Sequence, residues 1–402
     1  MFKKHFAVRT SVVAALAIGA GLAAAPAPAA TFQTLYSFTG GADGAAPYGR
    51  MVFNAKTGLL YGTTVSGGSG NGGTVFQFDP ASQVLTTLYS FTLGGKNGSS
   101  PQTRLTLGKN GLLYGVATTG GGSSACSFGC GTVFKFDPAT KVLKTLYAFT
   151  DQSDGGTPEG GLVFDSTHST VFGTTVQGGD FADCQGGCGT VYKLVLASKG
   201  FSTLHAFRSI ADDGADSTAG MVVDGAGILY GVATGGGPHG SGIVFRLDPA
   251  TGTYTVLHGF DYHVDGSGPN SDLLLKGGLL YGTTVSGGPT ANGYGTIFSM
   301  DPGTGAATTL YSFADGNDGI FPSGGLIAGP KSSLYGTAKQ GTPSGGGAVF
   351  ALKSKTGKFM ALYDFTGFAD GGSPQTGLVA GAGGALYGVT SLGNGTIFKI
   401  AP

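Results

Sequence analysis

The sequence has no tryptophan, only four cysteines in 402 residues, and a single glutamate, Glu159. Charged residues are scarce as well, at 11% of the chain, and the 22 basic residues balance the 22 acidic ones. Binding to nucleic acid needs clustered cations, so we expect no nucleic-acid partner. Because a glycosidase needs two facing carboxylates, such a pair would have to be drawn from the aspartates.

Amphipathic helical periodicity is also missing from the chain after residue 30. This absence excludes a nucleophile elbow between a strand and a helix, and it excludes phosphate-binding loops as the role of the glycine-rich stretches. The chain instead has 79 glycines and many short apolar runs. These runs recur in a fixed order, which makes an internal repeat the first feature to analyse.

The best-defined run is Leu60-Tyr61-Gly62-Thr63-Thr64. Its near copies, 51 to 58 residues apart, begin at Leu60, Leu113, Val171, Leu229, Leu280, Leu334 and Leu386. A second run, Gly-Thr-Val-Phe or a variant, begins at Gly73, Gly131, Gly189, Gly242, Gly295, Gly347 and Gly395. A third, similar to Leu-Tyr-Ser-Phe, begins at Leu35, Leu88, Leu146, Leu204, Leu257, Leu310 and Leu362. A weaker fourth run, such as Met51-Val52-Phe53, precedes each copy of the first.

Runs rich in Val, Thr, Tyr and Phe and bounded by Gly, Pro, Asp and Ser are typical of β-strands and turns. We denote the four strands of a unit A (Met51 type), B (Leu60 type), C (Gly73 type) and D (Leu88 type). Four strands in roughly 50 residues, repeated seven times, predict an all-β fold, a seven-bladed β-propeller of four-stranded antiparallel blades. A parallel β-helix would need shorter coils and ranks second.

The order of the runs is offset from the order of the strands within a blade, because the chain does not begin with an A strand. The chain after residue 30 begins with a D-type run at 31–38, and the last unit, 375–402, stops after its C run. Pairing Thr34–Phe38 with Thr396–Ile400 would complete the last blade, close the ring and remove two unpaired sheet edges. We therefore expect residues 31–402 to form a single propeller.

Residues 1–30 are predicted to be an export signal. Lys3, Lys4 and Arg9 give a positive start, Val12–Ala25 is apolar, and Ala27-Pro28-Ala29 offers a small-residue cleavage site. The apolar run is short for a membrane span, which needs about 20 residues; an uncleaved N-terminal anchor is the alternative. We expect an exported protein, secreted, periplasmic or at the cell surface, with no membrane span after cleavage.

Aromatic residues recur at fixed positions of strands B, C and D, and Gly62 and its six equivalents lie in the middle of strand B. Recurrence in every unit favours core packing over a ligand platform, because aromatic side chains dominate core burial. A glycine in the middle of a strand weakens the sheet. We predict that an aromatic ring approaches the backbone closely at this position.

The order of Leu-Tyr-Gly-Thr-Thr, Gly-Gly-Thr-Val-Phe, Asp-Pro-x-Thr-Gly and Leu-Tyr-Ser-Phe resembles the GloVer tandem repeat of exported bacterial proteins. These proteins are called "choice-of-anchor" because their sorting signals vary. The resemblance covers residues 31–402 and implies export and a repeat fold of the β-propeller kind. It implies no activity and no catalytic residues. This chain differs in having no recognisable C-terminal anchor.

Alternating strand directions put the A–B and C–D turns on one rim of the ring and the B–C and D–A loops on the other. The C–D turns, such as Asp79-Pro80-Ala81-Ser82, are short and use aspartate as a turn former. The B–C loops vary in length and consist mostly of glycine and serine. We expect any ligand site on the B–C/D–A face, over the central channel.

An aspartate–glycine pair recurs in six of the seven D–A loops, and Asn97-Gly98 takes the seventh place. The aspartates are Asp43, Asp154, Asp213, Asp265, Asp318 and Asp370. One interpretation is a ring of carboxylates that binds a ligand or Ca²⁺ together with backbone carbonyls. The other, which we favour because Ca²⁺ needs several spaced ligands, is a structural turn with glycine at positive φ. We expect no other cofactor.

The four cysteines lie in two successive B–C loops as two Cys-x₃-Cys pairs. In an exported protein an even count indicates disulfides, and we favour Cys126–Cys130 and Cys184–Cys188. Pairing across the two loops is an alternative, since their blades are neighbours. A zinc site of four cysteines is the third interpretation, disfavoured by an oxidising compartment.

Two functions are consistent with these patterns. The first is a non-enzymatic module, which we expect to be monomeric, that binds a protein or glycan on the B–C/D–A face or serves as a surface scaffold. The second is a secreted polysaccharide hydrolase or lyase, with aspartates of the ring and His239 or His263 meeting at the channel. His205 and His258 replace the tyrosine of strand D, and packing is the expected role of both. No single catalytic motif decides between these functions, but the regular repeat favours binding.

Overall fold

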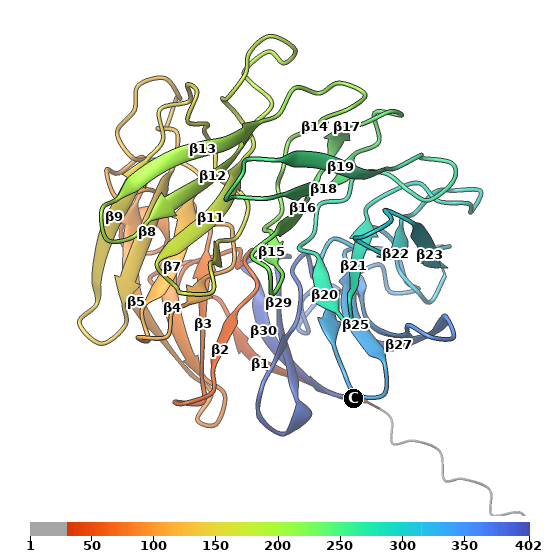
Figure 1. Ribbon diagram of the computed structural model, residues 1–402. Coiled ribbons are helices and arrows are strands. Elements are labelled where there is room, and N and C mark those ends of the chain that lie inside the picture. Colours follow the sequence, from red (N-terminus) through yellow and green to blue (C-terminus); the bar gives the residue numbers. More distant parts are fainter. Residues whose placement is uncertain (1–29, 315) are drawn as a thin grey trace, which may run out of the picture.

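The computed structural model describes residues 30–314 and 316–402. Residues 1–29 of the expected export signal lie outside the described residues. The described part is all-β: seven four-stranded antiparallel sheets form a ring, and the one helical segment is a 3₁₀ turn, η1 (Ala382–Gly384). The expected seven-bladed propeller is confirmed (Figure 1).

Each blade contains one strand of each type, with the A strands nearest the central channel. The A strands are β2 (Val52–Asn54), β6 (Thr106–Leu107), β10 (Val163–Phe164), β15 (Val222–Val223), β20 (Leu274–Lys276), β24 (Ile327–Ala328) and β28 (Val379–Ala380). The B strands are β3 (Leu59–Thr64), β7 (Leu113–Ala117), β11 (Thr170–Thr175), β16 (Leu229–Ala233), β21 (Leu279–Thr284), β25 (Ser333–Ala338) and β29 (Leu386–Thr390).

The C and D strands form the outer half of each blade. The C strands are β4 (Asn71–Asp79), β8 (Thr132–Asp137), β12 (Thr190–Val195), β18 (Ile243–Leu247), β22 (Thr296–Met300), β26 (Ala348–Lys353) and β30 (Thr396–Ala401). The D strands are β5 (Val84–Thr92), β9 (Val142–Ala148), β13 (Gly200–Ala206), β19 (Tyr254–Gly259), β23 (Ala307–Ser312), β27 (Lys358–Asp364) and β1 (Thr31–Ser37). A small extra ladder joins β14 (Gly214–Ala215) to β17 (Gly235–Gly236).

The ring closes as the offset frame predicted. Strand β1 pairs antiparallel with β30, from Thr31 opposite Ala401 to Ser37 opposite Thr396. In Figure 1 the red-orange start of the described chain lies beside its blue end. The last blade therefore has its fourth strand, and neither β1 nor β30 leaves an open edge at this junction.

A β-bulge that the sequence pattern did not reveal recurs in all seven pairs of C and D strands. In the first blade Val75 pairs with Tyr89 and Phe76 with Thr87, so Leu88 has no direct partner. The register shifts at the equivalent place in the other six blades. A bulge increases local twist, which suits the outermost strand of a propeller blade.

Aromatic contacts join every blade to the next. The phenylalanine of strand D packs on the aromatic ring of strand C in the following blade, with ring centroids 5.1 to 5.6 Å apart. The seven pairs are Phe38–Phe76, Phe91–Phe134, Phe149–Tyr192, Phe207–Phe245, Phe260–Phe298, Phe313–Phe350 and Phe365–Phe398. The pair Phe38–Phe76 crosses the closure, so the closing junction is built like the others.

The middle glycine of each B strand makes room for the aromatic ring of strand C, as predicted. A Cβ atom on Gly62 would lie 2.4 Å from Cζ of Phe76, and one on Gly282 would lie 2.5 Å from Cζ of Phe298. The other five equivalents meet the aromatic ring of strand C at 2.3 to 2.7 Å. The conformation of these glycines is ordinary for a strand, so the reason for glycine here is space.

We predict that Gly282→Ala lowers the free energy of unfolding by about 1–3 kcal/mol, the usual cost of overpacking a core. The added methyl group would also lie 2.9 Å from Leu273 Cδ2, so Phe298 has little room to move aside. Denaturant unfolding measures the change. Gly225→Ala is the matched control, because a Cβ there meets nothing within 4 Å, and it should leave stability unchanged. Equal stability of the two variants would contradict the packing argument.

Candidate functional site

The mouth of the central channel is lined by one polar side chain from each blade. We call this set the mouth ring: Tyr48, Gln102, Glu159, Thr218, Asn270, Ser323 and Gln375. Together with Thr234 these residues enclose a cavity of about 320 Å³. Each ring residue ends a D–A loop just before strand A, so the mouth opens on the B–C/D–A face, the face expected to carry a site.

A recurring proline fixes the backbone of this ring. In six of the seven D–A loops the ring residue directly follows a proline. That proline packs against the glycine that opens strand C of the preceding blade: a Cβ on Gly242 would lie 2.6 Å from Pro269 Cδ, and one on Gly395 would lie 2.4 Å from Pro47 Cδ. The proline also restricts φ, so the following side chain is held at a defined place over the channel.

Hydrogen bonding divides the ring into two parts. On one side Tyr48 donates to Gln375 Oε1, and Gln375 donates through Nε2 to Ser391 Oγ at 2.8 Å. On the other side the buried oxygens Thr218 Oγ1 and Asn270 Oδ1 have no hydrogen-bond partner within the described residues. Buried polar atoms are normally paired, so these two oxygens leave hydrogen-bonding capacity unused on this side of the mouth.

Glu159 is the one carboxylate of the mouth ring. Burial, and secondarily the negative charge of Asp216, raise its pKa above the ordinary glutamate value. Burial also raises the pKa of Asp216. These two acids come from the D–A loops that precede the third and fourth blades, and they lie close enough for the charge of Asp216 to act on Glu159.

The positions two residues after the mouth-ring residues form a second layer of the channel wall, and three of the seven carry charged side chains. Arg104 Nε is 2.6 Å from Asp272 Oδ2, and Arg50 Nη2 is 3.8 Å from the same oxygen. The Gly220 amide donates to Asp272 Oδ1 at 2.7 Å. Burial alone would raise the pKa of Asp272, but Arg104, Arg50 and the Gly220 hydrogen bond together lower it. We call Arg50, Arg104 and Asp272 the arginine layer.

Below the arginine layer the channel wall becomes apolar. Residues of the A strands, among them Val163, Val222, Leu274 and Ile327, line a cavity of about 500 Å³ whose upper boundary is the arginine layer. The channel therefore changes from hydroxyl and amide groups, through charges, to aliphatic side chains.

The aspartates of the Asp-Gly pairs each hydrogen bond within their own blade junction. The carboxylate of Asp43 accepts hydrogen bonds from the Tyr36 hydroxyl at 3.0 Å and from the Thr39 amide at 2.7 Å. Asp154, Asp318 and Asp370 repeat this pattern with the tyrosine of strand D, and Asp213 and Asp265 bond to the histidines that replace it. At the seventh position the direction is reversed, and Asn97 Nδ2 donates to the Tyr89 hydroxyl. Within the described residues no three potential metal-ligand side chains that include these aspartates lie within 4.8 Å of one another.

In the contact between Tyr36 and Asp43 the pKa of each partner moves in the direction expected of a hydrogen bond to a carboxylate. Burial and the nearby Asp43 raise the pKa of Tyr36 to about 12. Burial acts to raise the pKa of Asp43, but hydrogen bonds from Thr39 and Tyr36 bring it below the ordinary value. The geometry is that of the structural turn, and the six carboxylates are not brought together over the channel.

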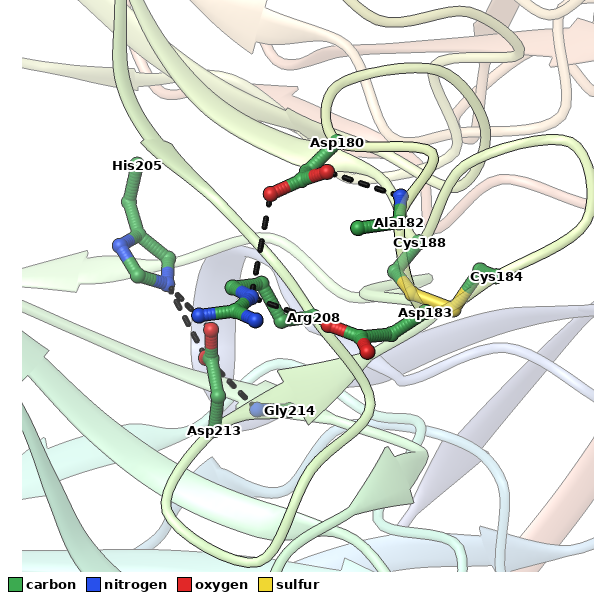
Figure 2. A network of polar contacts seen from close by, with 9 residues as sticks. All are labelled: Asp180, Ala182, Asp183, Cys184, Cys188, His205, Arg208, Asp213 and Gly214. Atoms are coloured by element: carbon green, nitrogen blue, oxygen red, sulfur yellow. Dashed lines mark hydrogen bonds and ion pairs between the residues drawn. A yellow bond between two sulfur atoms is a disulfide. The ribbon is translucent and has the colours of Figure 1, made fainter.

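His205 and His258, which stand where other blades have the tyrosine of strand D, also contact the aspartate of the Asp-Gly pair. Figure 2 shows His205 Nε2 facing the Asp213 carboxylate, at 3.0 and 3.1 Å from its two oxygens. Nearby, Arg208 Nε lies 3.0 Å from Asp183 and 3.8 Å from Asp180, beside a disulfide. His239 lies 3.9 Å from Asp261 in exposed loops, and neither His239 nor His263 lines the mouth cavity.

The cysteines pair within their own loops, as Cys126–Cys130 and Cys184–Cys188, with Cα atoms 5.2 and 5.4 Å apart. Cys126, Cys130 and Asp151 form the one group of three potential metal ligands in the described part of the chain. Both sulfur atoms of that group are in a disulfide, so they provide no thiolate for a metal. Neither cross-loop pairing nor a four-cysteine zinc site is the arrangement present.

The mouth ring and the arginine layer are the features that sequence reasoning missed. A signal for the ring exists: the residue that follows the proline of each D–A loop is polar in all six loops that have one. The arginine layer has no comparable signal, because its other four positions are Gly161, Gly220, Gly325 and Gly377.

We predict that Asp370→Ala lowers the free energy of unfolding by about 1–3 kcal/mol, because it leaves the Tyr363 hydroxyl and the Thr366 amide without their acceptor. Chelation of divalent cations should leave the unfolding temperature of the wild-type protein unchanged. Asp212→Ala, at an exposed aspartate of another D–A loop, is the control. A Ca²⁺-dependent rise in unfolding temperature that Asp370→Ala abolishes would instead support the ion-binding interpretation.

We also predict that Asp272→Asn destabilises the protein at pH 7 by about 3 kcal/mol, because it leaves two inward-facing cations without a counter-charge. The pKa of Asp272 is lower in the folded than in the unfolded chain, so its contribution is present above the ordinary aspartate pKa and is lost as pH falls through the folded-state value. The stability difference between wild type and variant should therefore narrow in acid. Unfolding curves from pH 7 to pH 3 measure this difference in stability. A difference that stays constant with pH would contradict the role of Asp272 as the counter-charge of the two arginines.

The described residues include no helix long and apolar enough to cross a membrane.

Many solved structures share this fold at low sequence identity. The extracellular domain of a protein from B. thetaiotaomicron, named as a hybrid two component system, matches with a TM-score of 0.62 at 10% identity, over 91% of this chain and 39% of that one. An oligogalacturonate lyase in complex with manganese matches with a TM-score of 0.55 at 13% identity, over 93% and 96% of the two chains. An oligogalacturonate lyase from Vibrio parahaemolyticus also matches with a TM-score of 0.55, at 11% identity over 92% and 96%.

At such identities these likenesses concern the fold alone. The chain spans about two fifths of the length of the extracellular domain that it matches. No curated protein matches the sequence. The family model described as the Gloeobacter/Verrucomicrobia repeat, however, matches residues 17–185, 127–293 and 278–402, which together take in most of the chain. The chain therefore belongs to the Gloeobacter/Verrucomicrobia repeat family.

Proposed function

We propose that this propeller is a glycan-binding module whose site is the mouth of the central channel. The observation that carries the proposal is the mouth ring, in which seven blades each present a hydroxyl, amide, carboxyl or phenol group to one cavity. Sugars present hydroxyl groups that both donate and accept, and a ring of such partners matches that chemistry. Its volume of about 320 Å³ lies at the lower end of the range for small-ligand pockets.

The unpaired side of the ring is where the ligand would make most of its contacts. Thr218 Oγ1 and Asn270 Oδ1 are without partners within the described residues, and Glu159 stands next to Thr218 in the ring. The Tyr48–Gln375–Ser391 chain on the other side already has its hydrogen bonds. A ligand that supplies hydroxyl groups to the unpaired side gains hydrogen bonds without breaking existing ones, once the Thr218 and Asn270 side chains turn their buried oxygens toward the cavity.

A second candidate, a secreted polysaccharide hydrolase or lyase, is favoured by one observation. The charge of Asp216 acts on Glu159 of the mouth ring, and the pKa of each is raised, so the candidate acid pair includes the glutamate and is not drawn from the aspartates alone as expected. Groups perturbed in this way are candidates for acid–base catalysis. Binding ranks first because the mouth ring has one carboxylate and lacks histidine.

We further propose that the module acts outside the cytoplasm, as a monomer. Two disulfides support an oxidising compartment, in agreement with the export signal expected at the N-terminus. A protein ligand on the same face is the alternative to a glycan.

We predict that a glycan array with the purified protein yields a glycan ligand, and that Asn270→Ala weakens its binding about tenfold through the loss of a hydrogen-bonding amide. Asn110→Ala, in an A–B turn on the opposite rim, is the matched control and should leave affinity unchanged. Binding that survives Asn270→Ala, or that Asn110→Ala weakens equally, would contradict the mouth as the site. Turnover of the same glycans, abolished in Glu159→Gln, would favour the enzyme.

A further inference from the structure

Arg50 is the feature of the channel that a neutral glycan leaves unexplained. Its guanidinium lies in the arginine layer, with 24% of the side chain accessible from the channel. Within the described residues no hydrogen bond joins it to another group, and its one ion-pair contact is the long one, at 3.8 Å, to Asp272. A guanidinium has five donors arranged as a fork that matches a carboxylate, and in this position they are almost unused.

Asp272 cannot satisfy both arginines well. Its Oδ2 atom lies 2.6 Å from Arg104 Nε, and its Oδ1 atom accepts from the Gly220 amide at 2.7 Å. One carboxylate therefore serves two guanidinium groups. Arg104 Nε lies close to it without a well-aligned hydrogen bond, and Arg50 lies farther away. Burial, then repulsion from Arg104, lowers the pKa of Arg50, as expected for a cation whose counter-charge is shared.

The channel has space for another anion beside Arg50. The four remaining positions of the arginine layer are glycines, and the layer adjoins a cavity of about 100 Å³ that the mouth ring also lines. Glu159 is the one further charged side chain that lines this cavity. It stands one layer higher, in the third blade, and burial and Asp216 raise its pKa without an offsetting contribution from either arginine.

We propose that Arg50, supported by Arg104, binds a carboxylate of the ligand, and that the ligand of the mouth is an acidic sugar of the uronate type. Its hydroxyl groups would contact the mouth ring, and its carboxylate would reach one layer down to Arg50. The inference rests on the proposed function, since it names the class of glycan that the same site would take.

The test compares D-glucuronate with D-glucose, which differ at one carbon, by NMR or calorimetric titration of the wild-type protein at pH 7. We expect glucuronate to bind at least tenfold more tightly, the order expected of a charge-assisted bidentate contact. Arg50→Gln should remove that advantage while leaving glucose binding and the unfolding temperature unchanged. Arg50→Lys keeps the positive charge but lacks the forked guanidinium donors, so it should retain part of the preference for glucuronate over glucose.

Glu159→Gln provides a readout that a structural role for Arg50 would not give. It removes a negative charge from the same cavity and should strengthen glucuronate binding relative to glucose. Octanoate is the third probe, because the apolar half of the channel also ends at the arginine layer.

Three results would overturn the inference. Equal binding of glucuronate and glucose refutes the acidic sugar but leaves glycan binding standing. Binding of octanoate, lost in Arg50→Gln, without binding of glucuronate means that the carboxylate arrives from the apolar half. Binding of neither sugar, together with a negative glycan array, refutes both proposals.

Discussion

The whole ring depends on one close contact, the aromatic ring of strand C lying over the backbone of strand B. Only glycine allows it, because a Cβ on Gly62 would lie 2.4 Å from Phe76. The same aromatic ring then receives the phenylalanine of the preceding blade, as Phe38 packs on Phe76. At each junction, therefore, the aromatic ring of strand C packs between the backbone of strand B in its own blade and the phenylalanine of the preceding blade. Seven similar stacks hold the blades at similar spacings, which is what allows a ring to close without strain at any one junction.

The regular part of this fold could be predicted from sequence because it recurs. Strand identity, the blade count, the closure by β1 and the space needed at Gly62 all follow from features present seven times. The bulge at Leu88 could not be predicted, because nothing in Leu-Tyr-Ser-Phe distinguishes a bulged strand from a straight one. It becomes visible only when the register of the two strands is known, and that register is set by packing between blades.

The candidate site could not be predicted for the opposite reason. Its positions recur, but its residues differ: Tyr48, Glu159 and Asn270 share polarity and nothing else. A search for repeated motifs selects what the units have in common, so it pointed to the aspartates of the Asp-Gly pairs, which have a shared structural role. Arg50 and Arg104 come from two neighbouring units and Asp272 from a distant one, and only the ring brings Asp272 to the two arginines. The residues that differ between units are those that face the channel, where packing against a neighbouring blade does not restrict the side chain.

The pairing of β1 with β30 gives the order of events during synthesis a physical meaning. Strand β1 is made before every other strand of the propeller and has no partner until β30 has been made. Until then the incomplete ring of blades has an unpaired strand edge at each end. The ring closes when β30 pairs with β1. Loss of β30 alone would therefore leave β1 without its partner as well, so a change confined to the last blade would also affect the first strand of the propeller.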